Sequence, residues 1–420
     1  MTDPPTFFVG IDWSSTSHQV CIINAAGDVL AEKAFEHSGT GLNDLCLWLL
    51  ARAGAEPGRI AAAIETCHGP VVEMLVERGF QVFAINPKQL DRFRDRFTVA
   101  GAKDDRLDAR VLADSLRTDT RCFRHLLPDD AVVIELREWS RMAEDLQQER
   151  IRLSNRLRDQ LWRYYPQMLD LGEDTDAPWR LALWQLAPTP ERARRLRPGT
   201  VADLLRRHRI RRFDADAVLD RLRQPAVQVA AGTVDAARAH IGQLLPRLRL
   251  VHRQLDEALA RLDALCARLT ESGGNDTPGQ SGEQHDAAIL RSLPGVGRIV
   301  LATLLAEAGD VLRRRDYHGL RSLSGVAPIT RRSGKHTIVQ MRNACSRRLR
   351  TALYHWARVA SQCDPQSRDR YRALRARGQS HGRALRQVGD RLLRIACTLL
   401  ERRECFDPAR ASGKPQAATA

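Results

Sequence analysis

Three apolar segments with the alternating pattern of β-strands open the chain, and they constrain its fold more than any other feature. A tight hairpin at residues 25–28, where Gly27 supplies unusual backbone angles, joins the second segment to the third. Helical and strand-type segments then alternate, an order that predicts a mixed sheet with helices packed on it. The expected elements are strands at 7–12, 17–25 and 28–35, a helix at 42–54, a strand at 59–65, a helix at 71–79 and a strand at 81–87.

Four acidic residues lie in this pattern where a metal site could form. The order of elements is that of a ribonuclease-H-like fold, so Asp12 and Glu65, which end the first and fourth strands, can project from neighbouring central strands. Asp105 and Asp108 are three residues apart and share one face of a predicted helix. Four converging carboxylates repel one another unless divalent cations neutralise them. Two Mg²⁺ ions held there could activate a nucleophile and stabilise a leaving oxygen at a phosphodiester.

Each acid has a simpler interpretation as an ordinary surface charge or a helix cap. For Asp105 and Asp108 alone that interpretation is the stronger one, whereas the set of four favours a site. Asp104 competes with them, but its side chain would point about 100° away on a helix. The segment around Asp12 also resembles the first phosphate loop of sugar kinases and actin-type ATPases, although the sequence lacks their second loop and their Gly-rich adenosine motif.

Two long amphipathic helices are predicted in the middle of the chain. Pro246 is expected to kink or restart the second of them. The heptad seam of this helix could form a dimerisation arm, an antiparallel hairpin with the first helix, or both. The first stripe, within about 129–166, consists of Leu136, Trp139, Ala143, Leu146, Leu153, Leu157 and Tyr164. The seam consists of Leu248, Val251, Leu255, Ala258, Leu262, Leu265 and Leu269, with Ile241 and Leu244 as a possible extension.

The balance of charge predicts a polyanionic partner. Lys and Arg number 66 against 51 Asp and Glu, which gives a net charge of +15 and favours nucleic acid. Arginines concentrate between the two long helices, and among them Arg206, Arg207 and Arg209 are candidates for contacts with phosphates. A solvated helical face is the alternative. The full cluster is Arg192, Arg194, Arg195, Arg197, Arg206, Arg207, Arg209, Arg211 and Arg212.

Other features of the sequence limit the class of protein. No apolar run approaches the roughly 20 residues of a membrane span, and no signal peptide opens the sequence, so we expect a cytoplasmic, nucleoid-associated protein. Nine cysteines without a C-x-x-C pair argue against zinc ribbons and disulfide frameworks.

The sequence is predicted to divide into five parts. They are an α/β domain at 1–125, a helical coiled-coil region with the basic segment at 126–272, a linker at 273–286, a mainly helical domain at 287–406 and a disordered tail at 407–420.

Two motifs near the C-terminus suggest contacts with phosphates. The segment L-P-G-V-G has the shape of a helix-hairpin-helix turn, in which Gly295 and Gly297 let backbone amides approach a phosphate. The second motif is expected to form a loop, and it places a serine among basic residues that would draw a phosphate to its hydroxyl: Arg331, Arg332, Ser333, Gly334, Lys335 and His336. The residues alone favour Ser333 as a hydrogen-bond donor to phosphate, because a nucleophile also needs a base or a metal-neutralised acid nearby.

The order of these motifs resembles the IS110 family of insertion-sequence transposases, over about residues 7–120 and 288–360. The resemblance rests on the early acids, K-D-D-R-L-D-A, L-P-G-V-G, L-S-G-V-A-P and R-R-S-G-K. It implies a RuvC-like DEDD domain whose metal ligands are Asp12, Glu65, Asp105 and Asp108, and it makes Ser333 the nucleophile that joins covalently to DNA. One departure is the stretch Q-M-R-N-A-C-S-R-R-L-R, where the family commonly has Lys-x-Gly-Asn.

The resemblance also implies partners. Family members work as oligomers with a structured bridge RNA that pairs with donor and target DNA, so we expect Mg²⁺, DNA, a guide RNA and a homo-oligomer, either a dimer or a tetramer. The resulting hypothesis is a DNA transposase that forms a phosphoserine intermediate. The alternatives are a metal-dependent endonuclease of Holliday-junction type, in which water attacks, and a non-catalytic scaffold that binds nucleic acid.

Overall fold

The chain divides into two compact units in a computed structural model, Met1–Asp129 and Asp130–Ala420, and each is described by itself. The predicted boundaries within the second unit stay predictions. No helix in the described ranges is both long and apolar enough to cross a membrane. The residues that the structure describes are 4–97, 104–128, 130–271, 282–334 and 336–408.

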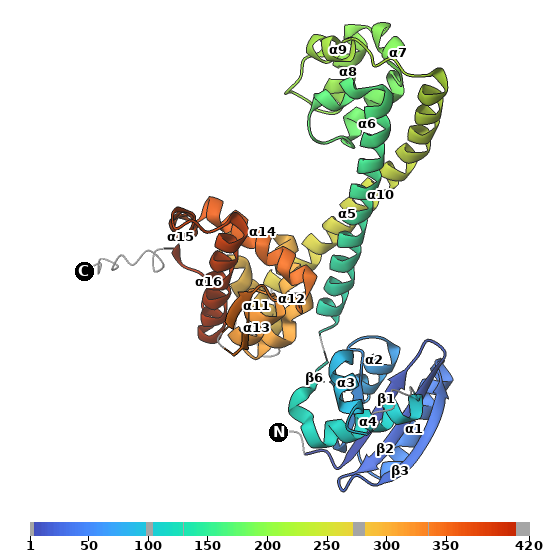
Figure 1. The fold of residues 1–420 in the computed structure, drawn as a ribbon, viewed down its shortest axis with the longest axis vertical. Coiled ribbons are helices and arrows are strands. Elements are labelled where there is room, and N and C mark those ends of the chain that lie inside the picture. The colour runs from blue at the N-terminus through green and yellow to red at the C-terminus, as the bar shows by residue number, and fades with distance from the viewer. Residues whose placement is uncertain (1–3, 98–103, 129, 272–281, 335, 409–420) are drawn as a thin grey trace, which may run out of the picture. The chain divides into compact units, whose positions relative to one another are not determined.

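A six-stranded mixed sheet forms the centre of the first unit (Figure 1). Its order is β3-β2-β1-β4-β5-β6, with β1, β4 and β5 parallel and the other three antiparallel to their neighbours. This is the mixed sheet that the sequence predicted, and the order is consistent with a RuvC-like fold. The strands are β1 (Phe7–Trp13), β2 (Ser17–Asn24), β3 (Val29–Glu36), β4 (Ile60–Ile64), β5 (Gln81–Ala84) and β6 (Arg124–Leu126).

Helices cover both faces of this sheet. α1 (Gly39–Ala53) and α2 (Pro70–Glu77) pack on the face that carries Val9, Ile11 and Ile64, while α3 (Pro87–Arg94) and α4 (Asp105–Asp119) pack on the other. Local signals set the ends of α1: the Ser38 side chain accepts a hydrogen bond from a backbone amide of the first turn, and Gly54 ends the helix in the left-handed conformation. β4 is buried along its whole length, as expected for a central parallel strand.

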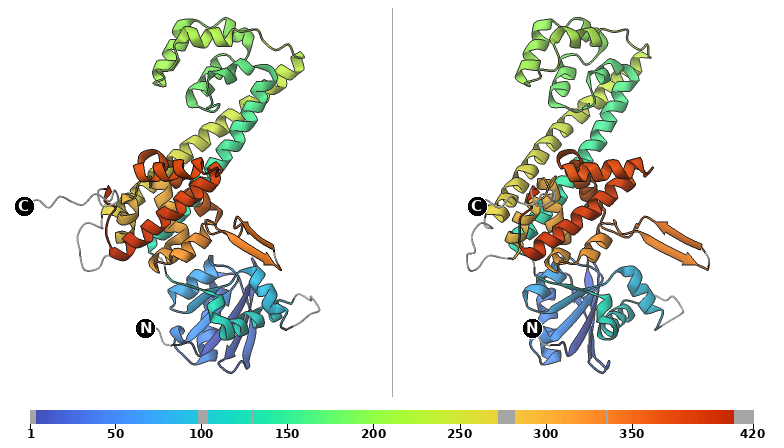
Figure 2. Two further views of the ribbon diagram at one scale, coloured as in Figure 1. Left: turned by 60° about the vertical axis from the view of Figure 1, so that its left-hand side comes forward. Right: turned by 90° about the vertical axis from the view of Figure 1, so that its left-hand side faces the viewer.

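Two long helices run side by side in the second unit, as both views in Figure 2 show. α5 (Ala131–Tyr164) leads to a group of short helices, and α10 (Ala231–Glu271) returns along it, so the two helices pair within one chain. The dimerisation arm stays a prediction. All seven seam residues from Leu248 to Leu269 are buried, as are Ile241 and Leu244. α10 continues through Pro246 and does not restart there. The short helices are η3 (Pro166–Leu171), α6 (Pro178–Leu186), α7 (Pro190–Arg194), α8 (Pro198–Arg207) and α9 (Ala215–Leu222).

The remaining helices share one core with the paired ends of α5 and α10. Trp356 is fully buried in this core, which also takes in Leu136 of α5 and Leu262 of α10. A mostly helical region thus follows the α/β unit, as predicted. Its elements are α11 (Gly282–Ser292), α12 (Arg298–Arg313), α13 (Tyr317–Leu323), β7 (Ile329–Ser333), β8 (His336–Gln340), α14 (Arg347–Cys363), α15 (Pro365–Ala376) and α16 (His381–Arg402).

Candidate active site and nucleic-acid interface

Asp12 and Glu65 lie next to each other at the same end of two parallel strands. The register pairs Ile11 with Ile64, so the two acids are the next residues along neighbouring strands. Because side chains alternate between the faces of a sheet, both acids belong to the face opposite Ile11 and Ile64, which is the face that α4 covers. Both are partly exposed. Two carboxylates thus share one end of the central strands.

The helix that packs on that face, α4, contains the other two acids. It lies directly against Gly10 of β1, where a Cβ atom would be only 1.8 Å from the carbonyl oxygen of Ala109. Asp108 precedes that residue and is buried, with 2% of its surface exposed, whereas Asp105 in the first turn is exposed. Asp104 caps the helix by accepting a hydrogen bond from a backbone amide, so its role is structural. Only Gly allows α4 to approach β1 this closely.

An arginine that the sequence did not single out holds the buried carboxylate of Asp108. Arg94 donates two hydrogen bonds to it, from Nε to Oδ1 at 2.6 Å and from Nη2 to Oδ2 at 2.8 Å. Burial lowers the pKa of the Arg94 guanidinium, but the hydrogen bonds and charge of Asp108 and the charges of Asp91 and Glu65 raise it by more. Across the residues that the structure describes, no three His, Cys, Asp or Glu side chains form a group that could hold a metal ion. The predicted convergence of Asp12, Glu65, Asp105 and Asp108 is therefore not found in the described part of this structure, and Arg94 balances the charge of Asp108.

Ser333 lies at the end of β7, beside the turn of a two-stranded hairpin that extends from the helices of its unit (Figure 2). Gly334 has the positive φ of 55° that favours glycine in such a turn. Arg331, Arg332 and Ser333 are exposed, and Lys335 lies outside the described residues. The sequence predicted a loop here. The structure instead gives paired strands, which fix the direction of each side chain.

The two glycines of L-P-G-V-G have different surroundings. Gly295 has a φ of 80°, and a Cβ there would lie 2.7 Å from the backbone nitrogen of Ala360 in α14. The Trp356 indole donates a hydrogen bond to the carbonyl of Pro294 at 2.9 Å, which fixes the same turn against α14. Gly297 caps α12, is exposed and has open space where a Cβ would be. The close approach of α14 explains why a glycine is needed at position 295. The helix-hairpin-helix assignment stays a prediction.

The arginine cluster is solvent-exposed around the short helices of the second unit. All nine of its members are exposed, including Arg207. Arg206 makes an exposed ion pair with Asp203 at 2.8 Å, and Arg209 ends the first turn after α8 in the left-handed conformation, with a φ of 57°. The segment therefore offers many guanidinium groups to a polyanion. Among the three predicted contacts, and within the described residues, Arg206 alone forms an ion pair with a carboxylate.

One exposed aromatic residue belongs to the same helical region. Trp162 of α5 has 71% of its surface exposed, although its neighbours Leu161 and Tyr164 are buried. Arg158 and Arg163 beside it are exposed as well. Trp162 lies off the predicted apolar stripe of α5 and was not among the predicted site residues; its sequence signal is a tryptophan outside that stripe and close to two arginines. An exposed indole among arginines can stack on an unpaired base.

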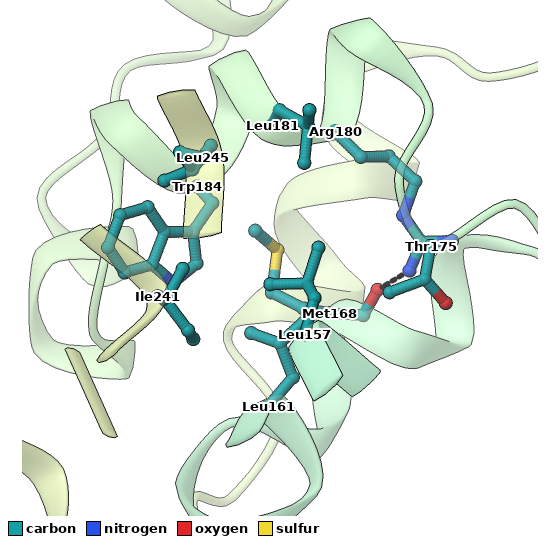
Figure 3. A pocket seen from close by; sticks show the side chains of 9 residues that line it. All are labelled: Leu157, Leu161, Met168, Thr175, Arg180, Leu181, Trp184, Ile241 and Leu245. Carbon is teal, nitrogen blue, oxygen red and sulfur yellow. Dashed lines mark hydrogen bonds between the residues drawn. The ribbon is translucent and has the colours of Figure 1, made fainter. Parts of the chain in front are cut away.

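A small pocket in the same region is part of the core (Figure 3). Leu157, Leu161 and Trp184 are among the apolar side chains that line it. The Arg180 guanidinium at its edge is already engaged, because it donates hydrogen bonds to the carbonyl oxygens of Met168 and Gly172. Burial lowers the pKa of Arg180 to about 10. We assign this pocket a structural role.

A mixed sheet with acids at its central strand ends, followed by an arginine-rich helical unit, fits a protein that acts on nucleic acid. Comparison with known proteins identifies the family. Residues 9–166 match the IS110 DEDD family model, described as Transposase, and residues 287–372 match the model described as Transposase IS116/IS110/IS902 family.

Related proteins agree with these matches. The mini-circle protein for IS117 of Streptomyces coelicolor, named as a transposase, is 35% identical over 416 residues, which cover 97% of each chain. The y4uE protein of Sinorhizobium fredii, also named as a transposase, is 59% identical over 216 residues, and the match spans 51% of this chain and 60% of that protein. The insertion element IS110 43.6 kDa protein of Streptomyces coelicolor is 27% identical over 413 residues, 95% of each chain. The chain belongs to the IS110 family of insertion-sequence transposases.

Proposed function

We propose that this protein cuts and rejoins the DNA of an insertion sequence through a covalent bond between DNA and Ser333. The observation that carries the proposal is the hairpin, which presents an exposed serine hydroxyl beside Arg331 and Arg332. Guanidinium groups next to a hydroxyl attract a phosphodiester and stabilise the negative charge that builds up when the hydroxyl attacks it.

The acids of the first unit support a metal-assisted reaction. Asp12, Glu65, Asp105 and Asp108 would hold Mg²⁺, since carboxylate oxygens are the donors that this ion prefers. Arg94 donates hydrogen bonds to both carboxylate oxygens of Asp108, so Mg²⁺ would have to displace this guanidinium to bind Asp108. Bound Mg²⁺ would neutralise charge on the scissile phosphate and on the leaving oxygen. The sheet order supports a RuvC-like domain as the scaffold of these ligands.

The second unit would bind the polyanions of the reaction. Its exposed arginines suit phosphate contacts with donor and target DNA and with a structured bridge RNA, and Trp162 adds a surface on which a base can stack. The glycine turn at Gly295 and Gly297 would add backbone contacts to phosphate at the start of α12. We further propose that the protein works as a homo-oligomer, because family resemblance supports a dimer or tetramer.

One experiment tests both parts of the proposal. The full-length protein is incubated with cognate DNA, guide RNA and Mg²⁺, and denaturing gels are read for DNA linked to protein. Ser333→Ala should abolish the adduct, and Asp12→Ala should abolish or strongly reduce it. Ser380→Ala is the matched control, since Ser380 is exposed in the same unit and makes no capping hydrogen bond; Asp44→Ala, on an exposed position of α1, is the control for the acid.

The same gels separate the competing reactions. DNA cleavage by Ser333→Ala, together with no adduct in the wild type, would replace the serine mechanism with attack by water. Binding of DNA without metal-dependent cleavage in any variant would favour a scaffold.

A further inference from the structure

We propose that His336 is the general base that activates Ser333. The inference rests on the proposed function and adds to it the group that takes the serine proton. The sequence alone does not identify such a group, because it does not give the direction of the side chains around the serine. The pairing of β7 with β8 now determines that direction.

The hairpin register puts the two side chains across from each other. Ser333 pairs with His336, and Arg331 pairs with Ile338 two residues further from the turn. Residues directly opposite in an antiparallel pair point to the same face, with Cβ atoms about 5 Å apart. An imidazole extends far enough from its Cβ to meet a serine hydroxyl over that separation. Both residues are exposed, so a DNA phosphate can reach the pair.

The alternation of side chains also separates the two arginines. Arg331 is two residues from Ser333 on β7 and shares its face, whereas Arg332 and its partner Thr337 belong to the other face. The face with the reacting group therefore contains a hydroxyl, an imidazole and one guanidinium. Arg331 is the charged group of the described hairpin residues on that face. Arg331 would bind the phosphate while His336 handles the proton.

The proposed step balances in protons and bonds. The Ser333 Oγ gives its proton to His336 and forms a bond to phosphorus, and the phosphorus–oxygen bond to the leaving nucleotide breaks. The leaving oxygen lies on the opposite side of phosphorus and takes a proton from water, while the imidazolium gives its proton to water, so a free nucleotide hydroxyl and a neutral imidazole remain. In the rejoining step a nucleotide hydroxyl gives its proton to water and attacks phosphorus, and the serine oxygen leaves and takes a proton from the His336 imidazolium. No oxidant or reductant is needed.

The test measures the rate of adduct formation by the full-length protein with DNA, RNA and Mg²⁺ as a function of pH. General base catalysis typically contributes a factor of about 10² to 10⁴, so His336→Gln should slow the adduct by at least 100-fold while DNA binding stays unchanged. The fall in rate toward acidic pH should disappear in this variant. His355→Gln is the matched control, since His355 is an exposed histidine of the same unit, and Thr337→Ala controls for disturbance of β8.

A second variant separates chemistry from structure. His336→Ala leaves space beside Ser333, and added imidazole should restore part of the adduct rate, which no loss of hairpin structure would allow. Adduct formation by His336→Gln within about threefold of wild type, with the acidic limb unchanged, would overturn the role of His336 and leave the serine mechanism intact. Absence of any adduct in wild type, with cleavage retained in Ser333→Ala, would overturn both proposals.

Discussion

The ion pair between Arg94 and Asp108 gives the sharpest prediction for the first unit. Replacing Arg94 with Ala removes both hydrogen bonds to a carboxylate that is 2% exposed. Breaking a buried ion pair from one side costs about 3 to 5 kcal/mol, because the remaining charge is left without a partner. The Arg94 side chain is 20% exposed and water can enter from its side, so we expect the lower end, about 3 kcal/mol.

Hydrogen exchange of the β1 and β4 amides in the full-length protein is the suitable measurement, since a chain of two units does not unfold in one step. A loss of about 3 kcal/mol corresponds to roughly a hundredfold faster exchange, at 1.4 kcal/mol for each factor of ten. Arg206→Ala is the matched control: it breaks an ion pair whose side chains are 81% and 57% exposed, and exposed pairs contribute about 1 kcal/mol or less.

A double variant and the addition of Mg²⁺ test the two assumptions behind this prediction. In Arg94→Ala combined with Asp108→Asn, most of the protection should return, since no buried charge remains. Millimolar Mg²⁺ should restore protection in the single variant and not in the double variant if the acids hold a cation. Equal effects of Arg94→Ala and Arg206→Ala would refute the argument from burial, and failure of Mg²⁺ to act on the single variant would count against the metal ligands.

Three other predictions concern the second unit. Gly295→Ala should destabilise the contact between α12 and α14 by at least about 1 to 3 kcal/mol, because its Cβ would strike the Ala360 backbone; exchange of α14 amides reports this, and Gly297→Ala, with open space, should not change it. Trp162→Ala should weaken binding of single-stranded nucleic acid by about 1 to 3 kcal/mol per stacked base, with the circular dichroism spectrum unchanged. Burial raises the pKa of the Asp176 carboxyl, but hydrogen bonds from His252 and Arg150 lower it by more, so it lies well below its usual range. The depressed pKa means that Asp176 stabilises the fold above its ordinary pKa and less as the pH falls, so the loss of thermal stability in Asp176→Asn should be large at pH 7 and shrink below about pH 4.

For the four acids of the candidate site, the local sequence pattern was sufficient to predict the element in which each residue lies. Strand periodicity and turn residues placed Asp12 and Glu65 at the ends of central strands, and residue spacing placed Asp105 and Asp108 on a helix. These predictions depend on a few consecutive residues, whose backbone preferences are set by their own side chains. The loop predicted around Ser333 was wrong for the same reason: a short hairpin of polar residues has little apolar alternation to reveal it.

The sequence by itself determined the mixed sheet, the two long amphipathic helices, the basic character of the middle segment and the family resemblance. Only the tertiary structure decided which partner each of these features meets. It buried the heptad seam of α10 against α5 of the same chain, gave Gly10 and Gly295 their packing roles, paired Arg94 with Asp108 and set His336 across from Ser333. The physical reason is the distance along the sequence over which each feature is set. Periodicity depends on neighbouring residues and indicates which side of a helix or strand is buried. Ion pairs, close approaches of the backbone and strand registers join residues whose contact depends on the whole fold.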